Sequence, residues 1–369
     1  MADFSRVLAG PLATMTLGDL GAQVVKVERP GTGDETRQWA PPRSAGGEST
    51  YYLSVNRNKR SVTLDLSTAD GRAAARALAE RCDVLVENFA PGTMERFGLG
   101  YDELSAGNPG LIYASVTGFG RAAALPGYDF LVQAVGGLMS VTGSPESEPS
   151  KVGVALVDVL AGQNLAIGVL AALQARHRTG RGQRVEVDLL GSLLAALVNQ
   201  ASAYLNAGVV PERMGNRHPS IAPYETLRTA DRPIAVAVGN DGQFRRLATA
   251  VGEAALADDP RFTDNPARVR NRAALVTELE ARLSRHPAAH WIDRLTAAGV
   301  PCGPVNSVAE AFALASRLGT DPVVEGAGVR TVASPIGMSG TPPTYRLPPP
   351  SLGEHTEEIL DWLTGGTRS

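Results

Sequence analysis

The chain has 369 residues, of which 43% are hydrophobic and 20% charged, and its formal net charge is −3. This length suits two domains with a substantial core, and the composition excludes a disordered chain. The charge provides no basic field for nucleic acid, and no apolar run or leader pattern predicts a membrane span or secretion. Two distant cysteines, Cys82 and Cys302, fit a reducing cytoplasm and predict neither a disulfide framework nor a metal site.

The first 200 residues alternate between helical and strand patterns. A helix followed by a strand is predicted over 9–28, and an Ala-rich helix over 70–81. Further helices are predicted at 163–175 and 191–206, and short Val- and Ile-rich strands at 84–86, 111–116 and 184–188. Helices that alternate with such strands indicate an α/β fold with a parallel sheet.

The second half of the chain predicts a separate, smaller domain. We place the N-terminal part of a large domain at 1–200, a linker at 201–221 and a smaller α+β domain at 222–312. The expected elements of this small domain are a strand at 234–238 and helices at 243–252, 267–284 and 287–299. After the Pro-Gly turn at 301–304, few helix signals occur before the last one at 354–363.

Asp158 is the most unusual residue of the pattern. It is the only acid in the apolar stretch 151–162, close to the start of a mostly apolar helix past Gly162. A carboxylate is costly to bury without a partner, so chains keep one there mainly as a helix cap, in an ion pair or for chemistry. The residues alone leave a helix cap and a nucleophile both open.

Two segments have features of a nucleotide-binding site. Residues 18–28 imitate the helix–strand–acid unit of a dinucleotide fold, but the G-x-G-x-x-G fingerprint is absent, which favours ordinary α/β packing. Residues 86–97 combine a strand end, Asn88, Phe89, a Pro-Gly turn and Arg96. That segment could bind an anion through its backbone N–H groups and arginine, with the aromatic ring stacked on a purine. It could equally be an ordinary strand–loop–helix with a solvated arginine.

Three further groups have a functional and a structural interpretation. Tyr128 and Asp129 could supply a phenol and a second acid to a site that contains Asp158, or they could form a turn that leads into a helix. The turn Gly239-Asn240-Asp241-Gly242 follows a strand and could cover a ligand, or be a plain turn. Arg29 lies at the carboxyl end of a predicted strand, where ligands of parallel sheets bind.

Together these motifs resemble the class III CoA-transferase family of the CaiB/BaiF type. That family includes formyl-CoA transferase, carnitine CoA-transferase, succinyl-CoA-dependent dicarboxylate transferases and α-methylacyl-CoA racemase. The resemblance runs nearly end to end. It rests on residues 5–11, 25–30, 58–61, 86–89, 117–120, 127–129, 179–183, 215–220, 299–306 and 352–356.

The resemblance implies a Rossmann-like large domain built from both chain ends, so that residues 313–369 form a linker and return to it. It also implies an interlocked homodimer. The family's catalytic aspartate falls on Asp158, with Tyr128, Asp129 and the lid Gly239, Asn240, Asp241 and Gly242 as active-site support. Its CoA-binding positions fall on Ala9, Arg29, Leu64, Asn88, Phe89, Arg96 and Phe97. Coenzyme A and acyl-CoA enter as substrates, and no permanently bound cofactor or metal is expected.

The implied reaction moves CoA from an acyl-CoA donor, such as succinyl-CoA, to a carboxylic acid through a mixed anhydride and an aspartyl-CoA thioester. The alternative is an α-methylacyl-CoA racemase, and a non-enzymatic CoA-binding protein is a third reading. The racemase branch has a histidine where this chain has Tyr128. A phenol is a poor base at neutral pH, which favours the transferase.

Overall fold

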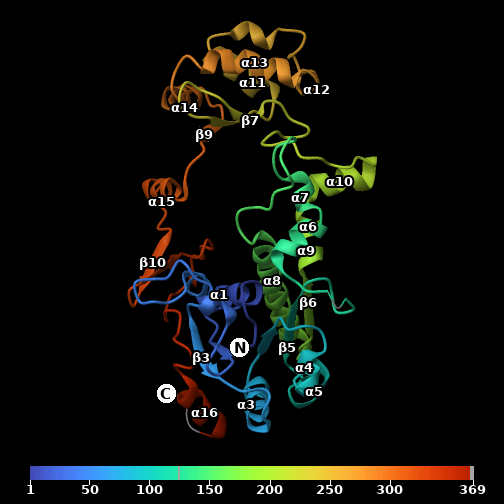
Figure 1. The fold of residues 1–369 in the computed structure, drawn as a ribbon, viewed down its shortest axis with the longest axis vertical. Coiled ribbons are helices and arrows are strands. Elements are labelled where there is room, and N and C mark those ends of the chain that lie inside the picture. The colour runs from blue at the N-terminus through green and yellow to red at the C-terminus, as the bar shows by residue number, and fades with distance from the viewer. Residues whose placement is uncertain (124, 366–369) are drawn as a thin grey trace. The chain divides into compact units, whose positions relative to one another are not determined.

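The computed structural model describes residues 1–123 and 125–365, which fall into two compact units (Figure 1). The large unit contains Met1–Leu138, Lys151–Val209 and Thr320–Ser369, and the small unit contains Met139–Ser150 and Val210–Gly319. The small domain that we placed at 222–312 lies inside the second of these segments. The sequence pattern did not assign residues 139–150 to it.

The large unit is built on one six-stranded sheet in which every neighbouring pair is parallel, as the sequence predicted. The order across the sheet is β3 (Lys59–Thr63), β2 (Val24–Glu28), β1 (Ala2–Asp3), β4 (Val84–Glu87), β5 (Ile112–Thr117) and β6 (Arg184–Asp188). The order reverses between β1 and β4. In such sheets, ligands bind beyond the carboxyl ends of the strands at this point of reversal.

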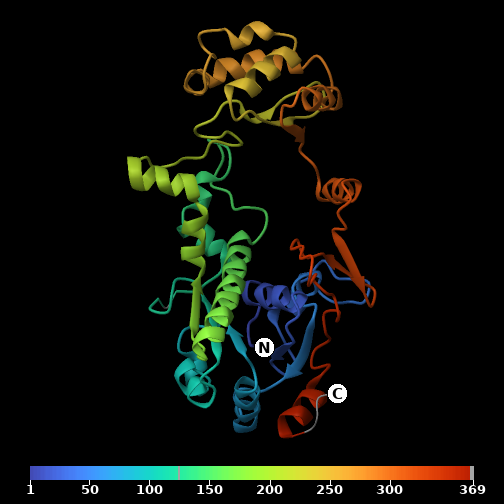
Figure 2. The ribbon, with the colours of Figure 1, turned by 180° about the vertical axis from the view of Figure 1, so that it is seen from behind.

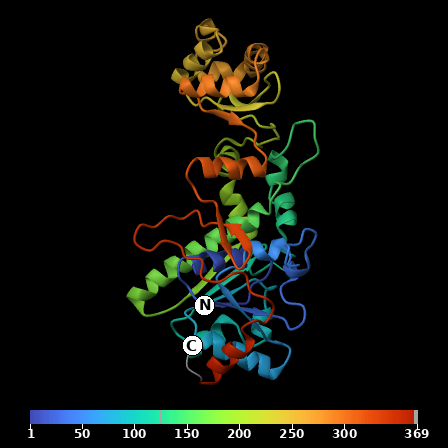
Figure 3. The ribbon, with the colours of Figure 1, turned by 90° about the vertical axis from the view of Figure 1, so that its left-hand side faces the viewer.

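Helices cover both faces of the sheet because each buried strand presents alternate residues to opposite sides. Val84 and Val86 of β4 belong to the core shared with α1 (Ala9–Asp19) and α8 (Leu156–Thr179). Leu85 belongs to the opposite core, with α3 (Ala69–Glu80), α5 (Tyr101–Gly107) and α16 (Thr356–Thr364). Figure 2 shows α8 (green) beside α1 (dark blue), and Figure 3 shows α16 (red) beside α3.

Helix α8 corrects two expectations. It begins at Leu156, not past Gly162. It is also the one helix among the described residues that is long and apolar enough to cross a membrane by length and composition, although no such segment was predicted. Its buried residues Val157, Ala161, Leu165 and Val169 pack in the core of the large unit, and core helices of this kind pass the same test.

Shorter elements complete the large unit. They are η1 (Glu35–Gln38), α2 (Thr50–Ser54), α4 (Thr93–Arg96), α6 (Asp129–Val135), α9 (Leu189–Ala196), α10 (Val198–Ala207), β10 (Val323–Gly326) and β11 (Val329–Val332). Helix α7 (Leu138–Val141) begins in the large unit and ends in the small one. The single helix expected at 191–206 is two, because Val198 has a φ of 40°, which breaks the regular backbone.

The small unit has a three-stranded antiparallel sheet in the order β7 (Tyr224–Leu227), β8 (Ile234–Ala237) and β9 (Cys302–Pro304). Its helices are α11 (Asp241–Ala250), η2 (Ala254–Ala257), α12 (Asn265–Arg270), α13 (Arg272–Leu283), α14 (Ala288–Ala297) and α15 (Val308–Arg317). The core gathers Phe244, Phe262 and Trp291. Helix α15 was missed, although Ser307 and Glu310 form a capping box, a signal that the sequence does contain.

Candidate active site

The predicted site residues of the large unit lie along the carboxyl edge of its sheet. Arg29 follows β2, Leu64 follows β3, and Asn88 follows β4. The segment that leads to Tyr128 and Asp129 follows β5, and Ala9 opens the helix after β1. Because the strands are parallel, their carboxyl ends meet at one edge.

Two pockets open at this edge. One, of about 490 Å³, is lined by Asp158 together with Leu8, Ala9, Asn88, Tyr128 and Asp129, and is called here the Asp158 pocket. The other, of about 620 Å³, is lined by Arg29, Leu64 and Phe97 and is called here the Arg29 pocket. Both share Arg6, Glu35, Trp39 and Phe89 in their lining, so the two pockets adjoin. The structure thus gathers six of the seven predicted CoA positions around two neighbouring hollows.

Arg96 is the predicted CoA position that lines neither pocket. It lies on α4, and its Nη2 donates a hydrogen bond of 3.0 Å to Thr93 Oγ1 at the protein surface. The sequence pattern brought Arg96 close to Asn88 and Phe89 along the chain. In the structure, Arg96 is the last residue of the one-turn helix α4, and its side chain lies outside both pockets.

Asp158 is the third residue of α8, within the first helical turn. Its carboxylate is largely buried and accepts no hydrogen bond from any residue of the described part of the chain. Burial, followed by the nearby charge of Asp129, raises the pKa of Asp158 to about 7. A carboxylate that accepts no hydrogen bond from the described residues, at the wall of a pocket, is available to react with a bound electrophile.

Asp129 takes the helix-capping role that the sequence left open for Asp158. The N-cap position of α8 is Ala155, whose side chain cannot accept a hydrogen bond. Asp129 Oδ1 accepts instead from the backbone N–H groups of Val157 at 2.8 Å and Asp158 at 3.3 Å. The free N–H groups of a helix start need such an acceptor, and an anion suits the positive end of the helix. This distant cap explains why α8 starts earlier than its local sequence predicts.

Gln133 fixes Asp129 in turn. It is fully buried on α6, and its Nε2 donates to Asp129 Oδ2 at 2.6 Å and to the Val154 carbonyl at 3.3 Å. Its Oε1 accepts from the Val152 N–H at 2.9 Å. One side chain therefore ties α6 to the segment that enters α8. Gln133 was not among the site residues predicted from the sequence.

The loop between β1 and α1 is held in an unusual conformation beside Asp158. Val7, which lines the Asp158 pocket, has a φ of 68°, a region that β-branched residues rarely adopt. Its N–H donates to both carboxylate oxygens of Asp34 at 3.3 Å. Asp34 is paired with the fully buried Lys26 at 2.9 Å, and Lys26 also donates to the Ser5 carbonyl. These buried charges keep the loop in place, which is how such strain persists at functional sites.

Sequence reasoning missed two aromatic residues near Asp158. Trp39 lines both pockets and meets Tyr51 edge to face, with ring centroids 5.1 Å apart. Burial, with the charges of Asp158 and Asp129 adding to it, raises the pKa of Tyr51 to about 12. Trp39 precedes the Pro-Pro loop and Tyr51 lies in α2, and neither position shows a pattern that would single it out.

The predicted lid residues belong to the small unit and form a helix start. Asn240 caps α11 by accepting from the Gln243 N–H at 2.9 Å, and the Gly239 N–H donates to Gln243 Oε1 at 2.7 Å. Asp241 pairs with Arg268 at 2.6 Å. The helix starts at Asp241, two residues before the predicted start, and Gly242 lies inside it. A lid role for this turn stays a prediction.

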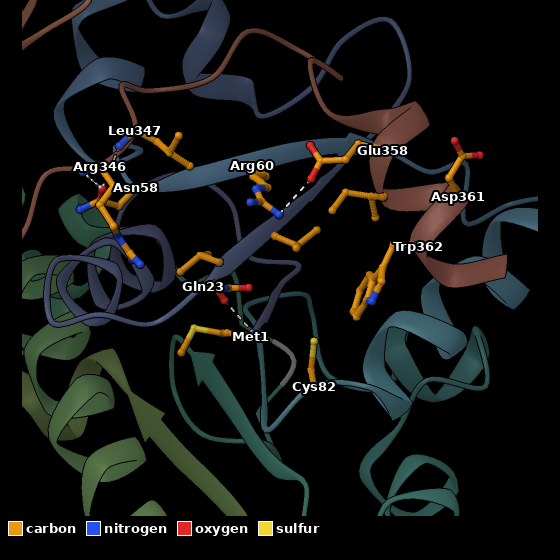
Figure 4. Close-up of a pocket in the computed structure, with 13 residues that line it drawn as sticks. Met1, Gln23, Asn58, Arg60, Cys82, Arg346, Leu347, Glu358, Asp361 and Trp362 are labelled. Carbon is orange, nitrogen blue, oxygen red and sulfur yellow. Dashed lines mark hydrogen bonds and ion pairs between the residues drawn. The ribbon is translucent and has the colours of Figure 1, made fainter. Parts of the chain in front are cut away.

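A third hollow of about 360 Å³ lies near the amino ends of β2 and β4 and is lined by none of the predicted site residues (Figure 4). Its lining includes an ion pair between Arg60 and Glu358 at 3.0 Å and the N-terminal amine, which donates to the Gln23 carbonyl at 2.9 Å. It lies at the edge of the sheet opposite to the Asp158 pocket, and we assign it no role in the chemistry at Asp158.

Comparison with known proteins supplies the family. The sequence profile of CoA-transferase family III matches residues 1–356. The chain is 42% identical to succinate–glutarate CoA-transferase from Agrobacterium fabrum, over 97% of this chain and 93% of that protein. It is 41% identical to acetyl-CoA:oxalate CoA-transferase from Acetobacter aceti, over 95% and 91%. A crystal structure of a CaiB/BaiF family protein from Brucella suis superposes with a TM-score of 0.88 at 43% identity, over 98% and 97% of the two chains.

Proposed function

The chain belongs to CoA-transferase family III, and from this premise we propose that it moves CoA between dicarboxylic acids with Asp158 as the nucleophile. The observation that carries the proposal is the Asp158 carboxylate, which lies in a pocket without a hydrogen-bond partner among the described residues. The names of the relatives from Agrobacterium fabrum and Acetobacter aceti support the substrate class, because succinate, glutarate and oxalate are all dicarboxylic acids. Succinyl-CoA is the donor that we assign.

The proposed reaction has four balanced steps. The Asp158 carboxylate attacks the thioester carbonyl of the donor, the C–S bond breaks, and a mixed anhydride and CoA thiolate form. The thiolate attacks the Asp158 carbonyl of that anhydride and releases the donor acid, which leaves an aspartyl-CoA thioester. The acceptor carboxylate attacks this thioester and expels CoA thiolate again. The thiolate then attacks the acceptor's carbonyl, which forms the new acyl-CoA and restores the Asp158 carboxylate.

The surroundings of Asp158 support this chemistry. A carboxylate is a weak nucleophile, so the site must exclude water and bind the oxyanion that forms at the attacked carbonyl. Asp158 is largely buried, and Leu8 and Ala9, at the start of α1, line the same pocket. No side chain caps this helix start. We assign its free N–H groups as the oxyanion donors.

We also propose that two chains form the interlocked homodimer that the family resemblance implies. None of the residues of α10 is buried in the single chain, and Val198, Tyr204 and Leu205 are between 58% and 75% exposed. Apolar side chains gathered on one exposed helix are typical of a protein–protein interface. A second copy of this chain is the partner that we assign to them.

Replacement of Asp158 tests the proposed function. We expect Asp158→Ala to lower CoA exchange between succinyl-CoA and glutarate by at least about 10³-fold, because the covalent route is lost. Asp102→Ala is the matched control, since Asp102 is an exposed acid on α5 outside both pockets. Undiminished exchange in Asp158→Ala would refute the proposal. Deuterium uptake at the α-carbon of a 2-methylacyl-CoA in heavy water would favour the racemase instead.

A further inference from the structure

Arg6 lies where the Asp158 pocket and the Arg29 pocket meet, and it lines both. The Asp158 pocket has one other cationic side chain in its described lining, Arg121. The guanidinium of Arg121 is already paired on both sides, with Glu95 at 3.0 Å and Glu186 at 3.1 Å. Arg6 pairs with one acid, whereas the charge of Arg121 is shared by two, so Arg6 is the cation of this pocket that is better placed to bind a further anion.

The donors of Arg6 are only partly used. Its Nη1 is paired with Glu35, and no other residue of the described chain accepts from the guanidinium. The Nε is buried and has no hydrogen-bond partner. Buried donors without a partner are rare in native proteins, and each one calls for an explanation. Nε and Nη2 together form the fork that binds both oxygens of a carboxylate.

The backbone of Arg6 is fixed, whereas its side chain is partly exposed. The Arg6 N–H donates to Asn88 Oδ1 at 2.9 Å, and Asn88 Nδ2 donates to the Arg6 carbonyl at 2.7 Å. The guanidinium lies over the Phe89 ring, 4.9 Å from its centroid, and its side chain is 40% exposed. A small movement away from this ring would present the unpaired fork to a bound anion.

We propose that Arg6 binds the second carboxylate of a dicarboxylic acyl group, the one that does not react. This inference rests on the proposed function and deepens it. In every step at Asp158 only one carboxyl of the dicarboxylic substrate reacts, whereas the other keeps its charge. An anion that enters a partly buried pocket needs a cationic partner, and a bidentate pair with arginine also fixes its orientation. Arg6 thereby selects dicarboxylic over monocarboxylic acids of equal length.

The test is isotope exchange between an acid and its own CoA thioester, which keeps donor and acceptor identical. Glutarate with glutaryl-CoA is compared with pentanoate and pentanoyl-CoA, which has the same chain length but no second carboxylate. We expect the wild-type chain to prefer glutarate. Arg6→Gln lowers kcat/KM for glutarate exchange by about 10- to 100-fold and leaves pentanoate exchange within about threefold. Arg6→Lys keeps the charge but loses the fork. Its kcat/KM for glutarate exchange should therefore lie between that of the wild type and that of Arg6→Gln.

Arg121→Gln is the matched control, because it removes an arginine of the same pocket whose charge is already paired with two glutamates. Its ratio of glutarate to pentanoate exchange should equal that of the wild type. Equal losses for both acids in Arg6→Gln, or a shared rise in KM for both thioesters, would assign Arg6 to CoA or to the scaffold and overturn the inference. The result is separate from the proposed function, since Arg6 can set the acid preference whichever residue is the nucleophile.

Discussion

At the residue scale, the chemistry depends on how two aspartates divide their roles. Asp129 is fixed by three N–H donors, from Val157, Asp158 and Gln133. Asp158 is left without a donor in the described part of the chain, and its charge is opposed by burial and by Asp129. The same pair of carboxylates therefore contains one that supports the helix and one that is free to react.

This division predicts a pH dependence. The pKa of Asp158 is raised to about 7, and only its carboxylate form attacks a thioester. CoA exchange should therefore rise as the pH increases from about 5 to 8, with a midpoint near 7. Asp129→Asn removes the neighbouring negative charge and should move the midpoint to lower pH. A wild-type midpoint near 4, the ordinary range of an exposed aspartate, would contradict this assignment.

Gln133 offers a second prediction at this scale. Gln133→Met keeps the size of the side chain but removes its bonds to Asp129 and Val152. Because buried partners are left unpaired, we expect the free energy of unfolding to fall by about 1–3 kcal/mol, as measured by urea denaturation. Gln163→Met, on an exposed position of α8, is the control and should stay within about 0.5 kcal/mol of the wild type. Equal stability of both variants would show that Gln133 does not support the site.

Sequence reasoning reached Asp158 because one acid in an apolar stretch is conspicuous. It could not decide between a cap and a nucleophile, since the acid that caps α8 comes from α6, 28 and 29 residues before the two N–H groups that it accepts from. Trp39, Tyr51 and Arg6 reach the site only through the arrangement of the strands. A periodic pattern along one segment carries no information about such contacts.

At the scale of elements, strands with dense Val and Ile content were predicted within a residue or two, as β4, β5 and β6 show. Strand β1 has only two residues, too few for any pattern, although it lies in the middle of the sheet. Strand β3 contains Lys59, which is fully buried and paired with Asp3 at 3.0 Å. A fully buried lysine in a strand is contrary to the rule by which strands are recognised, even though β3 lies at the edge of the sheet.

The buried pair of Lys26 and Asp34 gives a prediction for the loop that it supports. Both side chains are fully buried, so Lys26→Met alone leaves an unpaired carboxylate and should cost about 3–5 kcal/mol of unfolding free energy. The double variant Lys26→Met with Asp34→Leu should lose less than the two single variants combined. The exposed pair of Arg232 and Glu310 is the control, and breaking it should cost at most about 1 kcal/mol. Additive losses at Lys26 and Asp34 would contradict the coupling.

At the scale of the whole molecule, the sequence predicted an α/β fold with a parallel sheet and a second, smaller α+β region. The structure adds that the C-terminal helix α16 packs against α3 and β3 in the large unit. The sequence pattern alone did not predict that the C-terminal segment returns to the large unit. That expectation came from the family resemblance. Contacts between segments nearly 300 residues apart depend on the complete fold, because no local signal records them.

The proposed homodimer predicts a mass in solution of twice the 38.6 kDa of one chain, measured by light scattering. If the two chains are interlocked, differently tagged dimers should not exchange subunits over hours under native conditions, because one chain must open to release the other. Leu205→Glu on the exposed face of α10 should weaken assembly, as a buried charge at the interface is costly. A monomeric mass at micromolar concentration would contradict the proposal.

The most direct test of the central claim is mass spectrometry of the protein after brief incubation with succinyl-CoA and rapid digestion. We expect a covalent adduct, acyl or CoA thioester, on the peptide that contains Asp158, and no such adduct in Asp158→Asn. An adduct on a different peptide, or turnover of succinyl-CoA with glutarate while Asp158 stays unmodified under hydroxylamine trapping, would contradict it.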